Sequence, residues 1–159
     1  MYNYFMTIFI GADHRGFELK NSIIEYLQEK NIRIEDLGNY EKEENDDYPD
    51  YAQKVAQAVQ QNLNDFLGIV ICGSGIGVCI AANRYKKILC GLGFNEQQVK
   101  HSRENDHINI LALASDSINL EKAKSLVDTF INTTPIQNEK YLRRINKIDN
   151  SDYLPSHLQ

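Results

Sequence analysis

Residues 68–79 read GIVICGSGIGVC, and the rest of the chain can be interpreted outward from this stretch. It contains the continuous apolar run Ile69, Val70 and Ile71, which suits a strand buried on both faces of a parallel sheet. The run ends at Cys72 and a turn rich in glycine. Residues 78–83 can then open a helix whose free N–H groups point back at the turn. A thiol beside such a helix start ionises more readily, so we expect chemistry at this turn.

Strands and helices alternate on both sides of that stretch. Further strands are predicted at residues 7–10, 32–37, 88–93 and 108–112, and helices at residues 17–27, 52–63, 96–104, 120–131 and 138–148. The acidic segment 41–50 between the second strand and the second helix is interpreted as a solvated loop. The alternation predicts an α/β fold, a three-layer α/β/α Rossmann-like domain with a parallel sheet of about five strands. We expect residues 1–149 to form one domain and residues 150–159 a polar tail.

Composition narrows the class of protein. The chain has 159 residues, 42% of them hydrophobic, which is enough for one core, and its net charge of -5 offers no basic field for nucleic acid. The cysteines Cys72, Cys79 and Cys90 are odd in number and lack CxxC spacing, which favours reduced cytoplasmic thiols over a zinc site. No apolar run reaches membrane-spanning length, and residues 1–6 are too short and polar for a signal peptide. We expect a cytoplasmic protein that binds neither nucleic acid nor membrane.

In an open α/β sheet, ligands bind where the strands end. The candidate residues there are Asp13 and His14 after the first strand, Cys72 with Gly73, Ser74, Gly75 and Gly77 after the third, and Asn105, Asp106 and His107 just before the last. The glycines do not match a phosphate-binding Walker loop, and Asp13 would repel a dinucleotide pyrophosphate. They can let a small anionic ligand approach backbone N–H groups closely.

Four motifs together carry a resemblance. They are IGADHRGFELK at 10–20, DYP at 47–49, ICGSGIG at 71–77 followed by AAN at 81–83, and NILA at 109–112. With these motifs in this order, the chain resembles the type B ribose-5-phosphate isomerases and their sugar-phosphate isomerase relatives over nearly all of residues 7–148. The resemblance implies reversible conversion of ribose 5-phosphate to ribulose 5-phosphate in the pentose phosphate pathway, with no cofactor and no metal. It also implies a homodimer or homotetramer with shared active sites, and we expect helix 138–148 to pack on a partner subunit.

Such an isomerisation needs a base that moves a proton between C2 and C1, and donors that hold the enediolate oxygen. Cys72 matches the family's catalytic cysteine and is the candidate base. Ser74, with the amides of Gly73, Gly75 and Gly77, is the candidate enediolate holder. The resemblance also implies that Asp13 and His14 bind the sugar hydroxyls or ring oxygen, and that Lys140 and Arg144 bind the phosphate. Further candidate binding residues are Tyr48, Ile76, Asn105 and Asp106.

Two departures from the family pattern leave more than one sugar phosphate as the candidate substrate. Asn105 stands where the family has its ring-opening histidine, so His107, His101 or His14 are alternative groups for that step. Lys140 stands where the family has an arginine, and it lacks the bidentate fork. The alternatives are therefore an isomerase of a hexose 6-phosphate, such as galactose or allose 6-phosphate, or a sugar-phosphate-binding protein with altered catalysis.

Each of these candidate site residues could instead have a purely structural role. A cysteine at the end of a buried strand is often an inert core residue. Asp13 could cap the first helix, His14 could pack, and Tyr48 could pack at its turn. Lys140 and Arg144 could be ordinary cations on a solvated helix.

Overall fold

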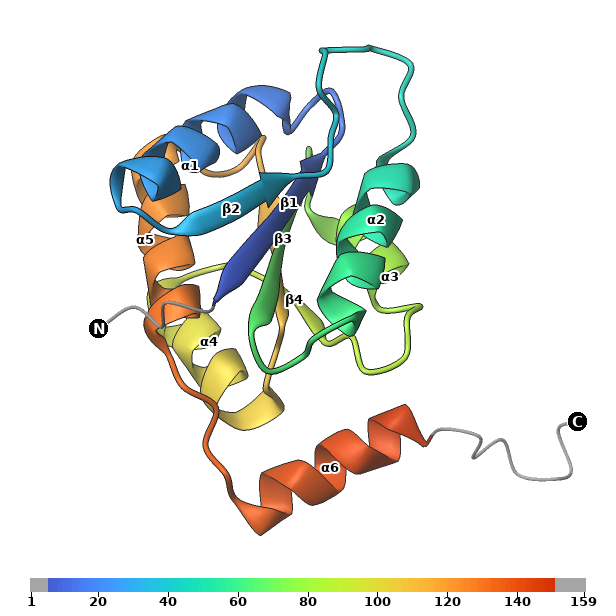
Figure 1. The fold of residues 1–159 in the computed structure, drawn as a ribbon, viewed down its shortest axis with the longest axis vertical. Helices are drawn as coiled ribbons and strands as arrows, with labels where there is room; N and C mark the ends of the chain where they lie inside the picture. Colours follow the sequence, from blue (N-terminus) through green and yellow to red (C-terminus); the bar gives the residue numbers. More distant parts are fainter. Residues whose placement is uncertain (1–5, 151–159) are drawn as a thin grey trace, which may run out of the picture.

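The computed structural model describes residues 6–150 and shows a five-stranded sheet in the order β2-β1-β3-β5-β4, with every neighbouring pair parallel (Figure 1). The predicted parallel α/β fold is confirmed. The strands are β1 Thr7–Ala12, β2 Arg33–Asp36, β3 Phe66–Cys72, β4 Cys90–Leu92 and β5 Ile110–Ala114. The helices are α1 Phe17–Glu29, α2 Tyr48–Gln60, α3 Ile76–Ala82, α4 Glu96–His101, the π-helical turn η1 Ser102–Asp106, α5 Leu120–Asn132 and α6 Glu139–Asp149.

The central strand β3 is covered on both faces, as its continuous apolar run predicts. Ile69 and Ile71 belong to the core on the side of α1, α4 and α5, whereas Val70 and Cys72 belong to the core on the side of α2 and α3. Each fully buried aliphatic side chain of this kind stabilises the fold by roughly 1.5–3 kcal/mol. Cys72 therefore ends β3 on the α2–α3 side. None of the helices between residues 6 and 150 is both long enough and apolar enough to cross a bilayer.

The segment before β5 differs from the prediction. The expected helix over 96–104 ends as an α-helix at His101, and η1 continues to Asp106. Ile108 then donates its N–H to the Ser102 carbonyl, which closes the turn instead of joining the sheet. The side chain of Asn109 binds Lys87 O at 2.8 Å and Leu89 N at 2.9 Å. The Asn109 main chain still joins the neighbouring strands, because its N–H donates to Leu89 O and its carbonyl accepts from Gly68 N, each at 2.9 Å. The turn therefore takes Ile108 out of the predicted strand over 108–112, and β5 runs from Ile110 to Ala114.

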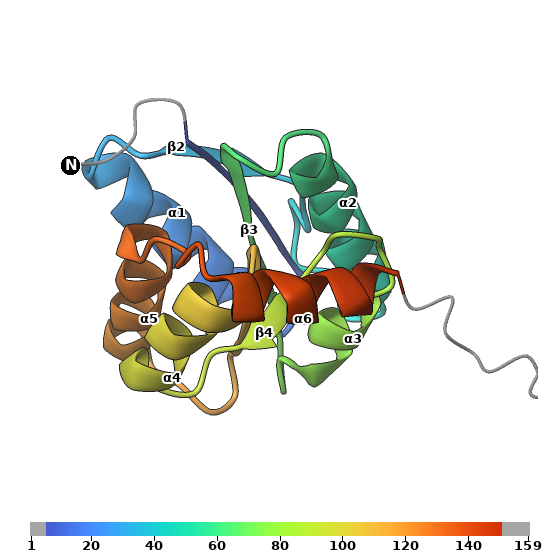
Figure 2. The same ribbon diagram turned by 90° about the horizontal axis from the view of Figure 1, so that it is seen from below.

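Helix α6 crosses the end of the sheet at which the strands begin (Figures 1 and 2) and lies close to η1. The Asp149 carboxylate at its end accepts a hydrogen bond of 3.1 Å from Lys87 N, just before β4. Among residues 6–150, those that line a hollow of about 940 Å³ along this helix belong to α6 or are Asn150. Beyond Asn150, the predicted polar tail lies outside the described residues.

Candidate active site

A cavity of about 280 Å³ opens where β1, β3 and β5 end, and it is lined by Asp13, Arg15, Tyr48, Cys72, Gly73, Ser74, Gly77 and Asp116. Cys72 pairs with Ala114 in the sheet, and its side chain lies at the strand end with 5% of its surface exposed. This is the edge at which parallel sheets collect ligands. We call this cavity the Cys72 pocket.

The glycine turn leaves backbone N–H groups available beside Cys72. Gly75 has φ +72°, and a Cβ there would come within 2.5 Å of Leu92 Cδ1, so the turn requires glycine. The Ser74 hydroxyl accepts a 3.2 Å hydrogen bond from Ile76 N, which begins α3, and Ile76 itself is 48% exposed. Within residues 6–150, the amides of Gly73, Ser74 and Gly75 have no protein acceptor. They can therefore receive an anionic oxygen.

Asp13 both shapes its loop and lines the Cys72 pocket. One of its carboxylate oxygens accepts hydrogen bonds from Arg15 N and Gly16 N, each 3.0 Å long. Burial raises the pKa of the Asp13 carboxyl above its usual value, although these backbone hydrogen bonds and the His14 ring oppose that shift. The capping role and a role in the pocket are thus both compatible with its position.

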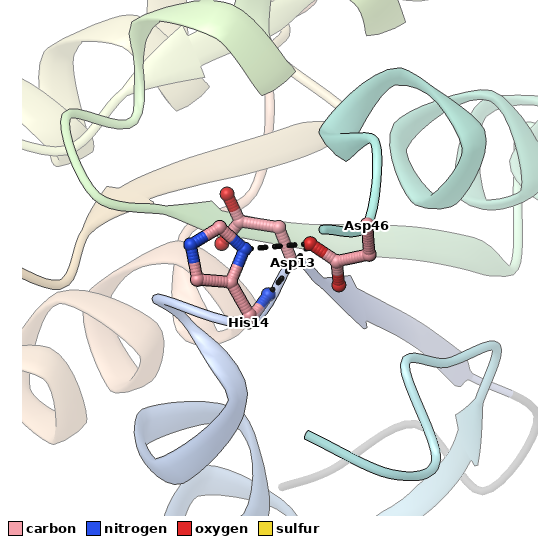
Figure 3. A group of neighbouring side chains, drawn as sticks. All are labelled: Asp13, His14 and Asp46. Atoms are coloured by element: carbon pink, nitrogen blue, oxygen red, sulfur yellow. Dashed lines mark hydrogen bonds and ion pairs between the residues drawn. The ribbon is translucent and has the colours of Figure 1, made fainter. Parts of the chain in front are cut away.

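Next to Asp13, the His14 ring points at a carboxylate from a different loop (Figure 3). His14 Nδ1 lies 2.7 Å from Asp46 Oδ1, and His14 N donates to the same oxygen at 3.1 Å. Asp13, His14 and Asp46 could each offer one ligand atom to a cation, because these atoms lie within 4.8 Å of one another. The hydrogen bonds of His14 and Asp46 already account for this arrangement.

Arg15 and Asp116 form an ion pair over the glycine turn. A Cβ at Gly73 would come within 2.6 Å of Arg15 Nε and 2.7 Å of Asp116 Oδ2, so the pair lies directly against that residue. Arg15 is the one cation among the described residues that line the Cys72 pocket, and its charge is already neutralised by Asp116. A phosphate in this pocket would need positive charge from elsewhere.

The other predicted site residues lie at the opposite end of the sheet. These residues are Asn105 and Asp106 on η1, and Lys140 and Arg144 on α6. The five residues of β5, Ile110–Ala114, separate the two ends, which is about 16 Å at the usual rise of a strand. Asn105 Nδ2 lies 2.9 Å from His101 Nδ1, and His107 Nε2 lies 3.0 Å from Ile136 O. Within one chain, only His14 among the candidate ring-opening groups lies beside the Cys72 pocket.

The sequence patterns do not identify two acidic residues of this region, Asp46 and Asp116, as candidate site residues. Asp46 lies in the segment 41–50 predicted to be a solvated loop, yet its side chain is only 2% exposed. Asp116 follows β5 at the edge that the strand-end rule selects, so that rule could have found it. For Asp46 the one signal was its place directly before the DYP motif.

Comparison with known proteins gives consistent matches. The family model described as Ribose/Galactose Isomerase matches residues 8–148. The ribose-5-phosphate isomerase B of Escherichia coli is 39% identical over 124 residues, which cover 78% of this chain and 82% of that protein. The crystal structure of ribose-5-phosphate isomerase B from Mycoplasma genitalium with bound ribulose-5-phosphate superposes with a TM-score of 0.88 at 39% identity, covering 92% of this chain and 96% of that one. A Thermotoga maritima ribose 5-phosphate isomerase reaches a TM-score of 0.85 at 42% identity, covering 91% and 97%.

Proposed function

This chain belongs to the ribose/galactose isomerase family and is an aldose–ketose isomerase, and we propose that it interconverts ribose 5-phosphate and ribulose 5-phosphate. The observation that carries the proposal is the Cys72 pocket, in which a cysteine, a carboxylate and free backbone amides meet at the edge of a parallel sheet. The identity of about 40% to ribose-5-phosphate isomerases supports the choice of a pentose phosphate.

In this proposal Cys72 is the base. Its thiolate takes the proton from C2 of the open-chain aldose, and the electron pair of that C–H bond forms the enediolate. The same proton, or one exchanged with solvent, returns at C1, and the hydroxyl proton of O2 moves to O1, so the carbonyl group lies at C2 in the ketose. Because the step moves protons and electrons only within the substrate, it invokes no cofactor. Cys72 suits the role since it lies at the strand end, against the turn that would hold the developing charge.

The free amides of Gly73, Ser74 and Gly75 would hold the enediolate oxygen. One donor of this kind typically lowers the barrier by about 2.7–4 kcal/mol. The Ser74 hydroxyl already accepts a hydrogen bond from Ile76 N, and it remains able to donate its own hydrogen. Asp13 and His14 would bind the sugar hydroxyls or the ring oxygen beside Cys72.

The phosphate would be bound by a second copy of the chain. The only cation lining the described Cys72 pocket is Arg15, and Asp116 already neutralises it. Lys140 and Arg144 are exposed on α6, and neither makes an ion pair with any residue between 6 and 150. A two-fold dimer with α6 against the neighbouring subunit would bring these cations to the pocket of that subunit.

Parallel turnover assays with ribose 5-phosphate, galactose 6-phosphate and allose 6-phosphate test the substrate. We expect the highest kcat/KM with ribose 5-phosphate. Turnover of a hexose phosphate but not of ribose 5-phosphate would replace the pentose with a hexose. Binding of sugar phosphates in a thermal-shift assay without turnover of any of them would contradict the proposed activity.

A further inference from the structure

The contact between His14 and Asp46 has the geometry of a histidine oriented by a carboxylate. A single oxygen, Asp46 Oδ1, receives both the ring Nδ1 at 2.7 Å and the backbone N–H of His14 at 3.1 Å. Two bonds from one residue to one oxygen restrict the ring rotation as well as the position of the backbone. The two residues come from different loops, after β1 and before α2 (Figure 3).

Asp46 is itself held in place. Its other oxygen, Oδ2, accepts a 2.8 Å hydrogen bond from Asn39 Nδ2, and only 2% of the side chain is exposed. Burial raises the pKa of the Asp46 carboxyl, but the hydrogen bonds from His14 and Asn39 outweigh burial, and the pKa lies below its usual value. At neutral pH the group is therefore a carboxylate, which can only accept hydrogen bonds.

An acceptor at 2.7 Å from Nδ1 requires a proton on that nitrogen. In a neutral imidazole the proton is then on Nδ1, and Nε2 is left as the acceptor. His14 stands beside Asp13, which lines the Cys72 pocket, so Nε2 is the ring nitrogen left to meet a ligand there.

We propose that Asp46 is a positioning residue of the active site, which holds His14 as the Nδ1–H tautomer and presents its Nε2 atom to the bound sugar phosphate. The inference rests on the proposed function, because it needs a sugar phosphate in the Cys72 pocket. Asp46 does not touch the substrate in this account and acts only through the His14 ring. Misplacement of such a group by about 1 Å can lower the rate about 100-fold.

The substitution Asp46→Asn tests the inference with little change of shape. The new amide can offer an oxygen either to His14 or to Asn39, but its NH₂ group then faces the other donor. We expect kcat to fall about 100-fold. Nitrogen NMR of ¹⁵N-labelled histidine, recorded above neutral pH without substrate, should show that His14 no longer exists only as the Nδ1–H tautomer. In a His14→Ala background, Asp46→Asn should leave the residual rate unchanged, because Asp46 acts through His14.

Asp128→Asn is the matched control. Asp128 accepts hydrogen bonds from Tyr26 and Lys30 on the α1–α5 side, away from the pocket, so its loss should lower stability without changing kcat or the His14 tautomer. If Asp46→Asn does not fold, the wild-type spectrum still tests the proposal, since an Nε2–H tautomer there would overturn it. Retention of the Nδ1–H form in Asp46→Asn, or rate losses that multiply in the His14→Ala background, would also overturn it. If the wild type does not turn over ribose 5-phosphate, the proposed function is contradicted. The tautomer of His14 can still be determined, because the NMR measurement needs no substrate.

Discussion

The ring of Tyr48 lies against Gly77, so closely that a Cβ added at Gly77 would come within 2.7 Å of Tyr48 Cζ. This contact joins the first turn of α2 to the first turn of α3 at the Cys72 pocket, which both residues line. Real Cβ atoms do not approach a ring this closely, so a larger residue at 77 must displace the Tyr48 ring.

Gly77→Ala should therefore lower kcat/KM, because the displaced ring changes the shape of the pocket. In a Tyr48→Ala background the same change should cost little, since the ring that it meets is gone. Steady-state kinetics of the two single variants and the double variant measure this coupling. Gly91→Ala is the control: its Cβ would meet Ile108 at 3.2 Å away from the pocket, so kcat/KM should not change. Additive losses in the double variant would contradict a direct steric contact.

Cys72→Ala should abolish turnover and keep the fold. The side chain is small and buried in the same core cluster as Val78 and Ala112, so removal of the sulfur costs little packing. We expect a melting temperature within about 4 °C of the wild type, which corresponds to about 1 kcal/mol for a chain of this size. Circular dichroism and a coupled assay for ribulose 5-phosphate measure the two effects. A rate near that of the wild type would remove Cys72 from the mechanism.

Asp13→Asn should unfold less readily than the wild type at pH 7. Burial raises the pKa of this carboxyl, so its ionised form costs stability above that pKa, and the cost disappears as the pH falls through the raised pKa. The stability advantage of the variant should therefore shrink as the pH is lowered, which urea unfolding between neutral and acidic pH measures. Asp13→Ala should be less stable than Asp13→Asn by about 1 kcal/mol, because Arg15 N and Gly16 N lose their acceptor. An advantage that grows on acidification would contradict the raised pKa.

Mixed subunits test the proposed partner contribution. Cys72→Ala and Arg144→Ala should each have low activity, the second through weaker phosphate binding. If a site combines Cys72 of one subunit with Arg144 of the other, random mixing makes half of the dimers mixed and each mixed dimer holds one intact site, so about a quarter of wild-type activity should return. The readout is activity after the two variants are unfolded and refolded together, with each refolded alone as the control. No recovery would indicate that each chain supplies its own cations.

Most of the fold could be predicted because its signals are local. The run at Ile69–Ile71 and the strand-ending cysteine required only neighbouring residues, and the helix spacing of α2 required only its own thirteen. The segment before β5 could not be predicted in this way. There the N–H of Ile108 bonds to the Ser102 carbonyl of the π-helical turn, and the Asn109 side chain bonds to Lys87 and Leu89, about twenty positions away.

The residues of the candidate site likewise fall into those that local sequence signals predict and those that they do not. Cys72 ends one strand, Ser74 follows it closely, and Asp13 follows another strand directly. Parallel strands bring such positions to one edge of the sheet, so their proximity followed from the pattern of strands. Asp46 lies 32 residues from His14, and Asp116 lies 101 residues from Arg15. No periodicity relates such pairs, because each depends on where two loops meet after the whole sheet has formed. Packing of the complete sheet also separates α6 from Cys72, so Lys140 and Arg144 lie at the other end of the sheet from the Cys72 pocket of their own chain.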